Sequence, residues 1–227
     1  MDVFIEICFI IGAYLLGSIP WALIISKIVA HVDIRNYGSK NMGATNTLRV
    51  LGFGSAFLCF FLDALKGAIP VALFSLGILS RSLIPHIHPI VLGLVALIGH
   101  VFPIYVGFKG GKGVACMTGI LLAYCPWCFI IEITVFILIL IFTKYVSAAS
   151  ITALFTAFLL SFTVKPIGCD APDPIFTIFC AIAFLFIIIL HLPNIRRLIK
   201  GEEPQVHRAI LKTKPEDLNK NEEKQDN

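Results

Sequence analysis

The sequence predicts an all-α polytopic membrane protein with seven transmembrane helices, and three observations support this prediction. The 227 residues are 58% hydrophobic and only 14% charged, and the mean hydropathy is +0.91. A soluble domain has about a quarter of its residues charged, so this chain lacks the polar surface that would cover a soluble core. Apolar runs recur along the chain, and most Lys and Arg lie between them.

Seven apolar runs are the predicted spans of a single transmembrane catalytic domain, residues 1–200. A helix needs about 20 residues to cross the hydrocarbon core, and the runs are separated by charged residues, Gly or Pro. Pro126 divides the stretch 113–143, which would be too long for one span. The predicted spans are 3–29, 53–78, 87–106, 113–125, 127–143, 146–163 and 175–192.

Both ends of the chain are polar. A secretory signal peptide begins with basic residues, whereas this chain begins with the acidic Asp2 and Glu6. The first apolar run is therefore predicted to be a retained span. Residues 201–227 are charged and contain Pro, and they predict a polar cytoplasmic tail that is disordered after its first turn.

The distribution of basic residues predicts the orientation. Fifteen of the eighteen Lys and Arg fall in alternate loops and the C-terminal tail, whereas the opposite side holds only Arg81 and Lys165. Because cytoplasmic loops carry the excess of Lys and Arg, the C-terminus is predicted in the cytoplasm and the N-terminus outside. The net charge of +4 is thus explained by topology, and no nucleic-acid site is predicted.

The seven cysteines are scattered through apolar stretches, which is typical of buried thiols that pack as small hydrophobic residues. Cys125 and Cys128 form a C-x-x-C pattern, so a redox or metal role is a minor alternative there. No second pair of ligands accompanies them, and we predict no metal site.

Three polar segments share the predicted cytoplasmic face. The first covers residues 38–49, where small residues allow backbone N–H groups to converge and polar side chains supply donors for phosphate or carboxylate oxygens. The alternative is a flexible amphipathic loop with capping Ser and Thr. Its candidate functional residues are Ser39, Lys40, Asn41, Thr45, Asn46 and Arg49.

The second segment is rich in Gly and Lys and leads directly into the fourth span. Glycines before a helix N-terminus can bind an anion through unpaired N–H groups and the positive end of the helix dipole. The spacing does not fit a Walker A loop. Anchoring by positive charge is the alternative, but it leaves the glycines unexplained. The predicted substrate-binding residues are Lys109, Gly110, Gly111, Lys112 and Gly113.

The third segment ends the last span. His191 can act as a general base, or it can simply cap the helix at the membrane boundary. Asn194 shares its helical face if the helix continues past Pro193. Within the second span, Asp63 and Lys66 form an i, i+3 pair that is either functional or a mutually satisfied structural pair.

Four motifs follow one another along the chain: GSIP, GSKNMGATNTLRVLG, GHVFPIYVGFKGGKGVA and HLPNIRRLIKGEE. Together they closely resemble the PlsY family of bacterial acyl-phosphate:glycerol-3-phosphate acyltransferases over residues 12 to about 203. The resemblance implies a multi-pass enzyme of the bacterial inner membrane, with its active site facing the cytoplasm. It implies transfer of an acyl group from acyl phosphate to the sn-1 hydroxyl of glycerol 3-phosphate, giving lysophosphatidic acid and phosphate. It implies no metal and no acyl-CoA, and we predict no cofactor and no obligate protein partner.

The resemblance also assigns roles to individual residues. It implies catalytic roles for Ser39, Arg49, His191 and Asn194, phosphate binding by Gly110, Gly111 and Gly113, and a structural role for Glu203. The chain departs from the family at Lys40, where Gly is usual, at Cys116, where Thr is common, and at Leu192 and Pro193, where polar residues are usual.

The chemistry of the transfer leaves one assignment open. Either His191 or a phosphate oxygen of the substrate accepts the hydroxyl proton. We interpret Ser39 as a hydrogen-bond donor, because direct attack on an acyl phosphate needs no acyl-enzyme.

A small transporter of an organic phosphate or anion is the alternative function. It would use Asp63, Lys66 and His100 near the middle of the membrane, with the Gly-Lys loop as a gate. The sequence has no internal repeat, and its polar groups gather on one face, which favours the enzyme.

Overall fold

Residues 2–206, the part of the chain that the computed structural model describes, form helices joined by short loops. Three short 3₁₀ turns occur at Ile34–Asn36, Arg81–Leu83 and Ile104–Val106. The α-helices are α1 (Asp2–Gly17), α2 (Trp21–Ala30), α3 (Ala44–Leu51), α4 (Phe53–Ser75), α5 (Pro89–Val101), α6 (Val114–Tyr124), α7 (Pro126–Thr143), α8 (Val146–Leu160) and α9 (Pro174–Ile199).

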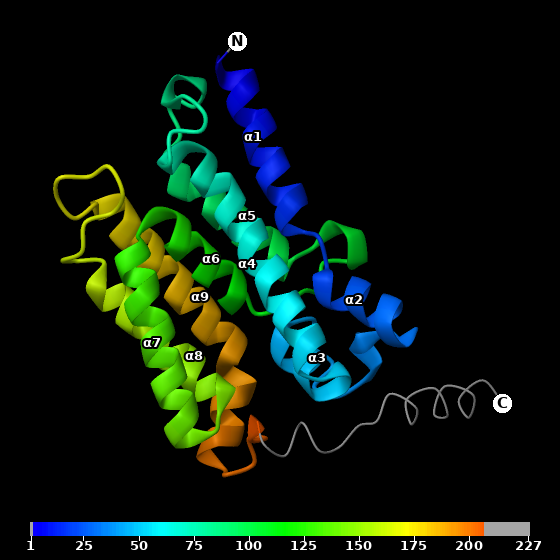
Figure 1. Cartoon of the computed structure of the whole chain (residues 1–227). Helices are drawn as coiled ribbons and strands as arrows, with labels where there is room; N and C mark the ends of the chain where they lie inside the picture. Colours follow the sequence, from blue (N-terminus) through cyan, green and yellow to red (C-terminus); the bar gives the residue numbers. More distant parts are fainter. Residues whose placement is uncertain (1, 207–227) are drawn as a thin grey trace.

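Helix α6 lies at the centre of the arrangement. It contacts α4, α5 and α7, while α1 packs on α5, and α8 packs on both α7 and α9 (Figure 1). Ile120 and Leu121 of α6 and Phe176 of α9 are fully buried in the largest core cluster. This core holds the N-terminal half of the chain against its C-terminal half.

The apolar helices coincide with the predicted runs. Five segments have the length and composition needed to cross a membrane: Val3–Ala30, Phe53–Ser75, Pro89–Val106, Pro126–Thr143 and Pro174–Ile199. The other two predicted runs are the shorter apolar helices Val114–Tyr124 and Val146–Leu160. The all-helical prediction is confirmed, whereas seven crossings and the orientation stay predictions.

The first predicted span is not one continuous helix. Helix α1 ends at Gly17 and α2 begins at Trp21. Pro20 has no N–H to continue the helical ladder, and its ring disfavours a preceding helical turn. A Cβ on Gly17 would lie 2.2 Å from the Ala96 carbonyl oxygen, so the chain turns where α1 meets α5 most closely.

Part of the segment that could have been a flexible loop is helical. Helix α3 begins after Gly43, whose carbonyl oxygen accepts from the amides of Asn46 and Thr47, each at 3.0 Å. Asn46, Thr47 and Val50 are buried, so this short helix is packed against the protein.

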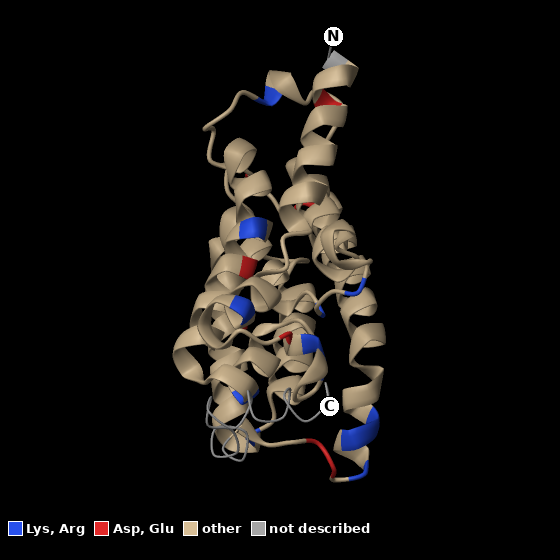
Figure 2. Cartoon of the chain, turned by 90° about the vertical axis from the view of Figure 1, so that its right-hand side faces the viewer, with Lys and Arg blue, Asp and Glu red and all other residues tan. Residues whose placement is uncertain are grey.

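The last helix is longer than the predicted 175–192, since α9 continues through Pro193 to Ile199. The chain then folds back, and the Val206 amide donates to the Lys144 carbonyl oxygen at 3.0 Å. The first turn of the predicted tail therefore belongs to the folded body, and the rest of that tail lies outside the described residues. Lys and Arg are concentrated in the lower half of Figure 2, at the end where Figure 1 shows α3.

Candidate active site

A cavity of about 1750 Å³ opens between the two halves of the protein, lined by α3, α4, the start of α6, and α7–α9. Its lining combines polar and apolar side chains. The polar lining includes Ser39, Asn41, Thr45, Arg49, Lys112, Ser147, His191, Asn194, Arg197 and Glu203. The apolar lining includes Phe53, Phe57, Phe60, Ile133, Phe136, Ile137, Leu140 and Leu190.

The N-terminus of α6 forms part of the polar wall. Gly113 precedes the helix with a left-handed φ of +86°, which favours glycine because it has no Cβ. The first N–H groups of a helix have no intrahelical partner and carry the positive end of its dipole. Gly113, Val114 and Ala115 line the cavity beside the half-buried Lys112, so this wall can bind an anion.

A hydrogen-bond network links Lys112 to the third polar segment. The Lys112 ammonium donates to the Asn194 side-chain oxygen, and the Asn194 amide donates to Glu203 Oε1 at 2.6 Å. Arg197 Nε donates to Glu203 Oε2 at 2.7 Å, and the Ser147 hydroxyl donates to Oε1 at 2.9 Å. Glu203 is thus a buried anchor that fixes Asn194 and, through it, the Lys112 side chain.

Burial and neighbouring charges shift the titration of this cluster. The pKa of Lys112 is lowered to about 8: burial is the main cause, Arg197 and Arg49 act in the same direction, and Glu203 opposes the shift. Burial also lowers the pKa of Arg49. Burial would raise the pKa of Glu203, but hydrogen bonds from Asn194, Arg197 and Ser147 outweigh it and lower that pKa.

The tautomer of His191 follows from its backbone contact. Nδ1 lies 2.9 Å from the Ile187 carbonyl oxygen, and a carbonyl can only accept, so we assign the proton of the neutral ring to Nδ1. Nε2 is then the acceptor on this cavity-lining residue. The helix continues through the exposed Pro193, so His191 and Asn194 share one helical face, as predicted.

Asn46 serves the loop that carries Ser39. Its side-chain oxygen accepts from the Ser39 amide at 2.7 Å. Its amide group donates to the carbonyl oxygens of Ile34, at 3.3 Å, and Tyr37, at 3.1 Å. The side chain is 1% exposed and its hydrogen-bonding groups are engaged, so Asn46 shapes the loop; it also lines the cavity, and its substrate-binding role stays a prediction.

Lys40 and Lys109 do not join the cavity. Both are exposed, and neither contributes to its lining, contrary to the substrate-binding roles predicted for them. Lys40 adopts a left-handed φ of +58°, which explains why Gly is usual at this position in the family that the sequence resembles.

Gly110 and Gly111 also differ from the prediction, because their amides are already used. Gly110 N–H donates to the Val101 carbonyl oxygen at 2.9 Å, and Gly111 N–H donates to that of His100 at 3.2 Å. A Cβ on Gly111 would lie 2.2 Å from His100 Nε2 and 2.6 Å from the Met42 carbonyl oxygen. These glycines allow close packing against the end of α5 instead of forming the predicted phosphate cradle.

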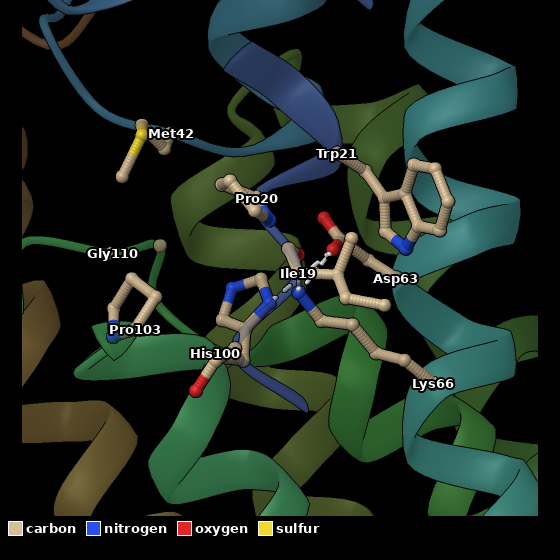
Figure 3. Close-up of a pocket in the computed structure, with 11 residues that line it drawn as sticks. Ile19, Pro20, Trp21, Met42, Asp63, Lys66, His100, Pro103 and Gly110 are labelled. Carbon is tan, nitrogen blue, oxygen red and sulfur yellow. Dashed lines mark hydrogen bonds and ion pairs between the residues drawn. The ribbon is translucent and has the colours of Figure 1, made fainter. Parts of the chain in front are cut away.

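Asp63 and Lys66 form a buried ion pair of 2.7 Å beside His100 (Figure 3). Lys66 also donates to the Ile19 carbonyl oxygen at 2.8 Å, and His100 Nδ1 lies 3.4 Å from Asp63. Lys66 thereby ties α4 to the break between α1 and α2. These contacts favour the structural alternative for the pair, although Asp63 and His100 also line the cavity described above.

Several polar residues of the cavity wall were not among the sequence candidates, and they include Arg197, Ser147, Thr118 and Glu132. Arg197 and Ser147 contact Glu203, and Thr118 donates a hydrogen bond to Glu132 at 3.2 Å. Glu132 interrupts an apolar run, and the rule that intramembrane charges mark functional positions could have found it. Ser147 gave no comparable signal, since a single Ser in an apolar helix is ordinary.

The fold and site define an integral membrane protein that can hold an anionic group and an apolar chain in one cavity. The sequence profile described as glycerol-3-phosphate acyltransferase matches residues 7–201. The chain therefore belongs to the glycerol-3-phosphate acyltransferase family of membrane enzymes known as PlsY, and the resemblance noted in the sequence is confirmed.

Individual relatives match over nearly their whole length. The glycerol-3-phosphate acyltransferase of Bacillus cytotoxicus is 40% identical over 207 residues, covering 90% of this chain and 96% of the relative. That of Fusobacterium nucleatum is 42% identical over 206 residues, covering 86% and 95%.

The fold is also similar to solved structures. The glycerol 3-phosphate form of PlsY (YgiH) has a TM-score of 0.76 and 40% identity, covering 88% of this chain and 94% of that chain. The lysophosphatidic acid form has a TM-score of 0.73 and 38% identity over the same shares.

Proposed function

We propose that the protein transfers an acyl group from acyl phosphate to the sn-1 hydroxyl of glycerol 3-phosphate, giving lysophosphatidic acid and inorganic phosphate. The observation that carries the proposal is a cavity whose lining combines cationic and apolar side chains. Both substrates carry a phosphate, and the donor also carries a long apolar chain. Phe and Ile side chains suit that chain, whereas Arg49 and Lys112 suit the phosphates.

In the proposed complex, the α6 N-terminus and Lys112 bind one phosphate, and Arg49, Ser39, Asn41 and Thr45 complete the polar pocket. Asn194 holds Lys112 in place, and Glu203 holds Asn194. This arrangement accelerates the acyl transfer mainly because it brings the glycerol hydroxyl and the acyl carbon together and stabilises the negative charge that develops. The Ser39 hydroxyl donates to a substrate oxygen.

We propose the following route for the proton of the sn-1 hydroxyl. The sn-1 oxygen attacks the acyl carbon, a C–O ester bond forms, and the bond to the phosphate oxygen breaks. His191 Nε2 accepts the hydroxyl proton and passes it to the departing phosphate, so charge and atoms balance. The Nδ1 contact to Ile187 supports this role, because it leaves Nε2 free to accept.

The cavity is proposed to open to the cytoplasm of the bacterial inner membrane. The support is the gathering of Lys and Arg at the end of the molecule that carries α3. Substrate glycerol 3-phosphate would then reach the polar lining from water, and the acyl donor would lie against the bilayer-facing helices.

Turnover by the full-length protein purified in detergent tests the proposal. We expect lysophosphatidic acid from glycerol 3-phosphate with palmitoyl phosphate and a negligible rate with palmitoyl-CoA, because no nucleotide-binding motif accompanies the site. Chromatographic separation of the two positional isomers should give the 1-acyl product. Equal rates with both donors would contradict the donor assignment, and a 2-acyl product would contradict the regiochemistry.

A further inference from the structure

Glu132 of α7 is a buried acid that the proposed reaction has not yet used. Its side chain is 1% exposed and lines the cavity. Thr118 of α6 lies 3.2 Å from Oε1, while Oε2 has no hydrogen-bond partner among the described residues. No ion pair between Glu132 and a cation occurs in that part of the chain.

Glu132 is close to the anion-binding end of α6. Side chains in a helix lean toward its N-terminus, and the Thr118 hydroxyl reaches the Val114 carbonyl oxygen at 3.1 Å, one turn back. Its single proton is shared between that oxygen and Glu132 Oε1. Two contacts, of 3.2 Å and 3.1 Å, thus connect Glu132 Oε1 to the Val114 carbonyl oxygen in the first turn of α6. Val114 and Ala115 line the same cavity.

The chemistry of the site favours the neutral acid. An ionised carboxylate without a cation costs much more in an apolar helix bundle than a neutral carboxyl group. The Thr118 hydroxyl has one proton: when it donates to Oε1, the acid proton lies on Oε2, and when it donates to the Val114 carbonyl oxygen, Oε1 can carry the acid proton and donate to Thr118. Neutral carboxylic acids in apolar sites can donate to an oxygen that gains negative charge.

We propose that Glu132 donates a hydrogen bond from Oε2 to the carbonyl oxygen of the acyl donor. This inference rests on the proposed function, since it requires an acyl group beside the phosphate bound at the α6 N-terminus. The carbonyl oxygen gains negative charge when the glycerol hydroxyl attacks, so the bond strengthens in the transition state. Glu132 thus contacts the reacting group directly.

Binding of two ligands that cannot undergo acyl transfer distinguishes a hydrogen bond from Glu132 to the acyl carbonyl from a purely structural role of Glu132. A long-chain β-ketophosphonate keeps the carbonyl, and the alkyl phosphonate of equal length lacks it. We expect the wild-type protein to bind the ketophosphonate at least about tenfold more tightly, as a charged or strong hydrogen bond would give. Glu132→Met should remove this preference, and Glu132→Gln, which keeps a donor, should retain most of it.

Turnover supplies the second measurement. Glu132→Met should lower kcat about 10²-fold or more, in the range for loss of one donor to a developing oxyanion, while Glu132→Gln should stay within about tenfold of wild type. Thr134→Val is the matched control, because Thr134 is an exposed polar residue on the same helix whose hydroxyl donates to the Ile130 carbonyl oxygen at 2.7 Å. The Thr134→Val variant should change neither the preference for the ketophosphonate nor kcat.

The outcomes distinguish this inference from the function on which it rests. Equal weakening of both ligands by Glu132→Met would assign Glu132 a structural role and overturn the inference. Equal binding of both ligands by the wild-type protein would overturn it too, even if no Met variant folds. Absence of turnover with palmitoyl phosphate would instead contradict the proposed donor, whatever the ligand preference.

Discussion

The surroundings of Lys112 determine both the position of its side chain and its pKa. It is half-buried, and it lies among two arginines and one glutamate, Glu203, which also fixes Asn194 as its partner. Burial lowers its pKa to about 8, so the ammonium that we place on a substrate phosphate begins to lose its proton just above neutral pH.

This shift predicts a pH-dependent substrate affinity. Above about pH 8 the charged form of Lys112 disappears, and KM for glycerol 3-phosphate or the acyl donor should rise, because a charged hydrogen bond contributes about 1.5–3 kcal/mol. Steady-state kinetics between pH 7 and pH 9.5 measure this. Lys112→Arg should flatten the profile, since a guanidinium stays protonated. Lys109→Arg, at an exposed residue outside the cavity, is the control and should keep the wild-type profile.

His191 is the second residue with a testable role, because its Nδ1 contact to the Ile187 carbonyl oxygen leaves Nε2 as the acceptor. If Nε2 accepts the hydroxyl proton, His191→Ala should lower kcat about 10²–10⁴-fold. Glutamine can place an amide oxygen near the position of Nε2, yet it cannot take up a proton at neutral pH. His191→Gln should therefore be nearly as slow as the Ala variant. Recovery of most of the activity by Gln would assign His191 to positioning and leave the substrate phosphate as the proton acceptor.

At the scale of elements, the short helices and the loops that join them determine which groups face the cavity. Helix α6 begins at Val114, directly after the buried Gly113, and its N-terminus, not the amides of Gly110 and Gly111, lines the cavity. The two preceding glycines allow the loop to pack on the end of α5.

The packing role of this loop makes a stability prediction. Gly111→Ala would press a methyl group against His100 and the Met42 backbone, so we expect a loss of about 1–3 kcal/mol and a lower melting temperature in detergent. Gly54→Ala is the matched control, because a Cβ there meets nothing within 4 Å and alanine favours a helix. An unchanged melting temperature with a raised KM would instead restore the phosphate-binding role of the Gly111 amide.

At the scale of the whole molecule, two helical halves meet along α6 (Figure 1), and a cavity lies between them. Most of the polar lining of that cavity comes from segments that are distant in sequence: residues 37–49, 112–113, 145–150 and 190–206. The asymmetry of charge along the molecule predicts how it is placed in the membrane.

Cysteine labelling tests that placement. In a variant whose seven native cysteines are replaced, single cysteines at the exposed positions Asn36 and Asp170 report the two sides. With an impermeant thiol reagent on intact cells, Asp170→Cys should react and Asn36→Cys should be protected, because fifteen of eighteen Lys and Arg favour the side of Asn36. Lysis should then expose Asn36→Cys. Reaction at both positions in intact cells would contradict the predicted crossings.

The sequence determined the features that depend on local pattern. Hydropathy and the positions of charge and Pro located every apolar helix to within a few residues, apart from the break at Ser18–Pro20 and the extension of α9. The three polar motifs identified the segments that form the cavity and the family to which the chain belongs. Helical periodicity was enough to place His191 and Asn194 on one face, because 3.6 residues per turn is a local property.

Only the tertiary structure decided which members of those motifs face the cavity. Lys40, Lys109 and Lys112 are equally basic in sequence, yet only Lys112 lines the cavity, because α9 and Glu203 approach it from more than 80 residues away. The amides of Gly110 and Gly111 donate to carbonyl oxygens at the end of α5. The tertiary structure decides this too, because a backbone donor bonds to the acceptor that the fold brings near it. The partner of Glu132 is likewise a contact between helices, which no pattern within α7 specifies.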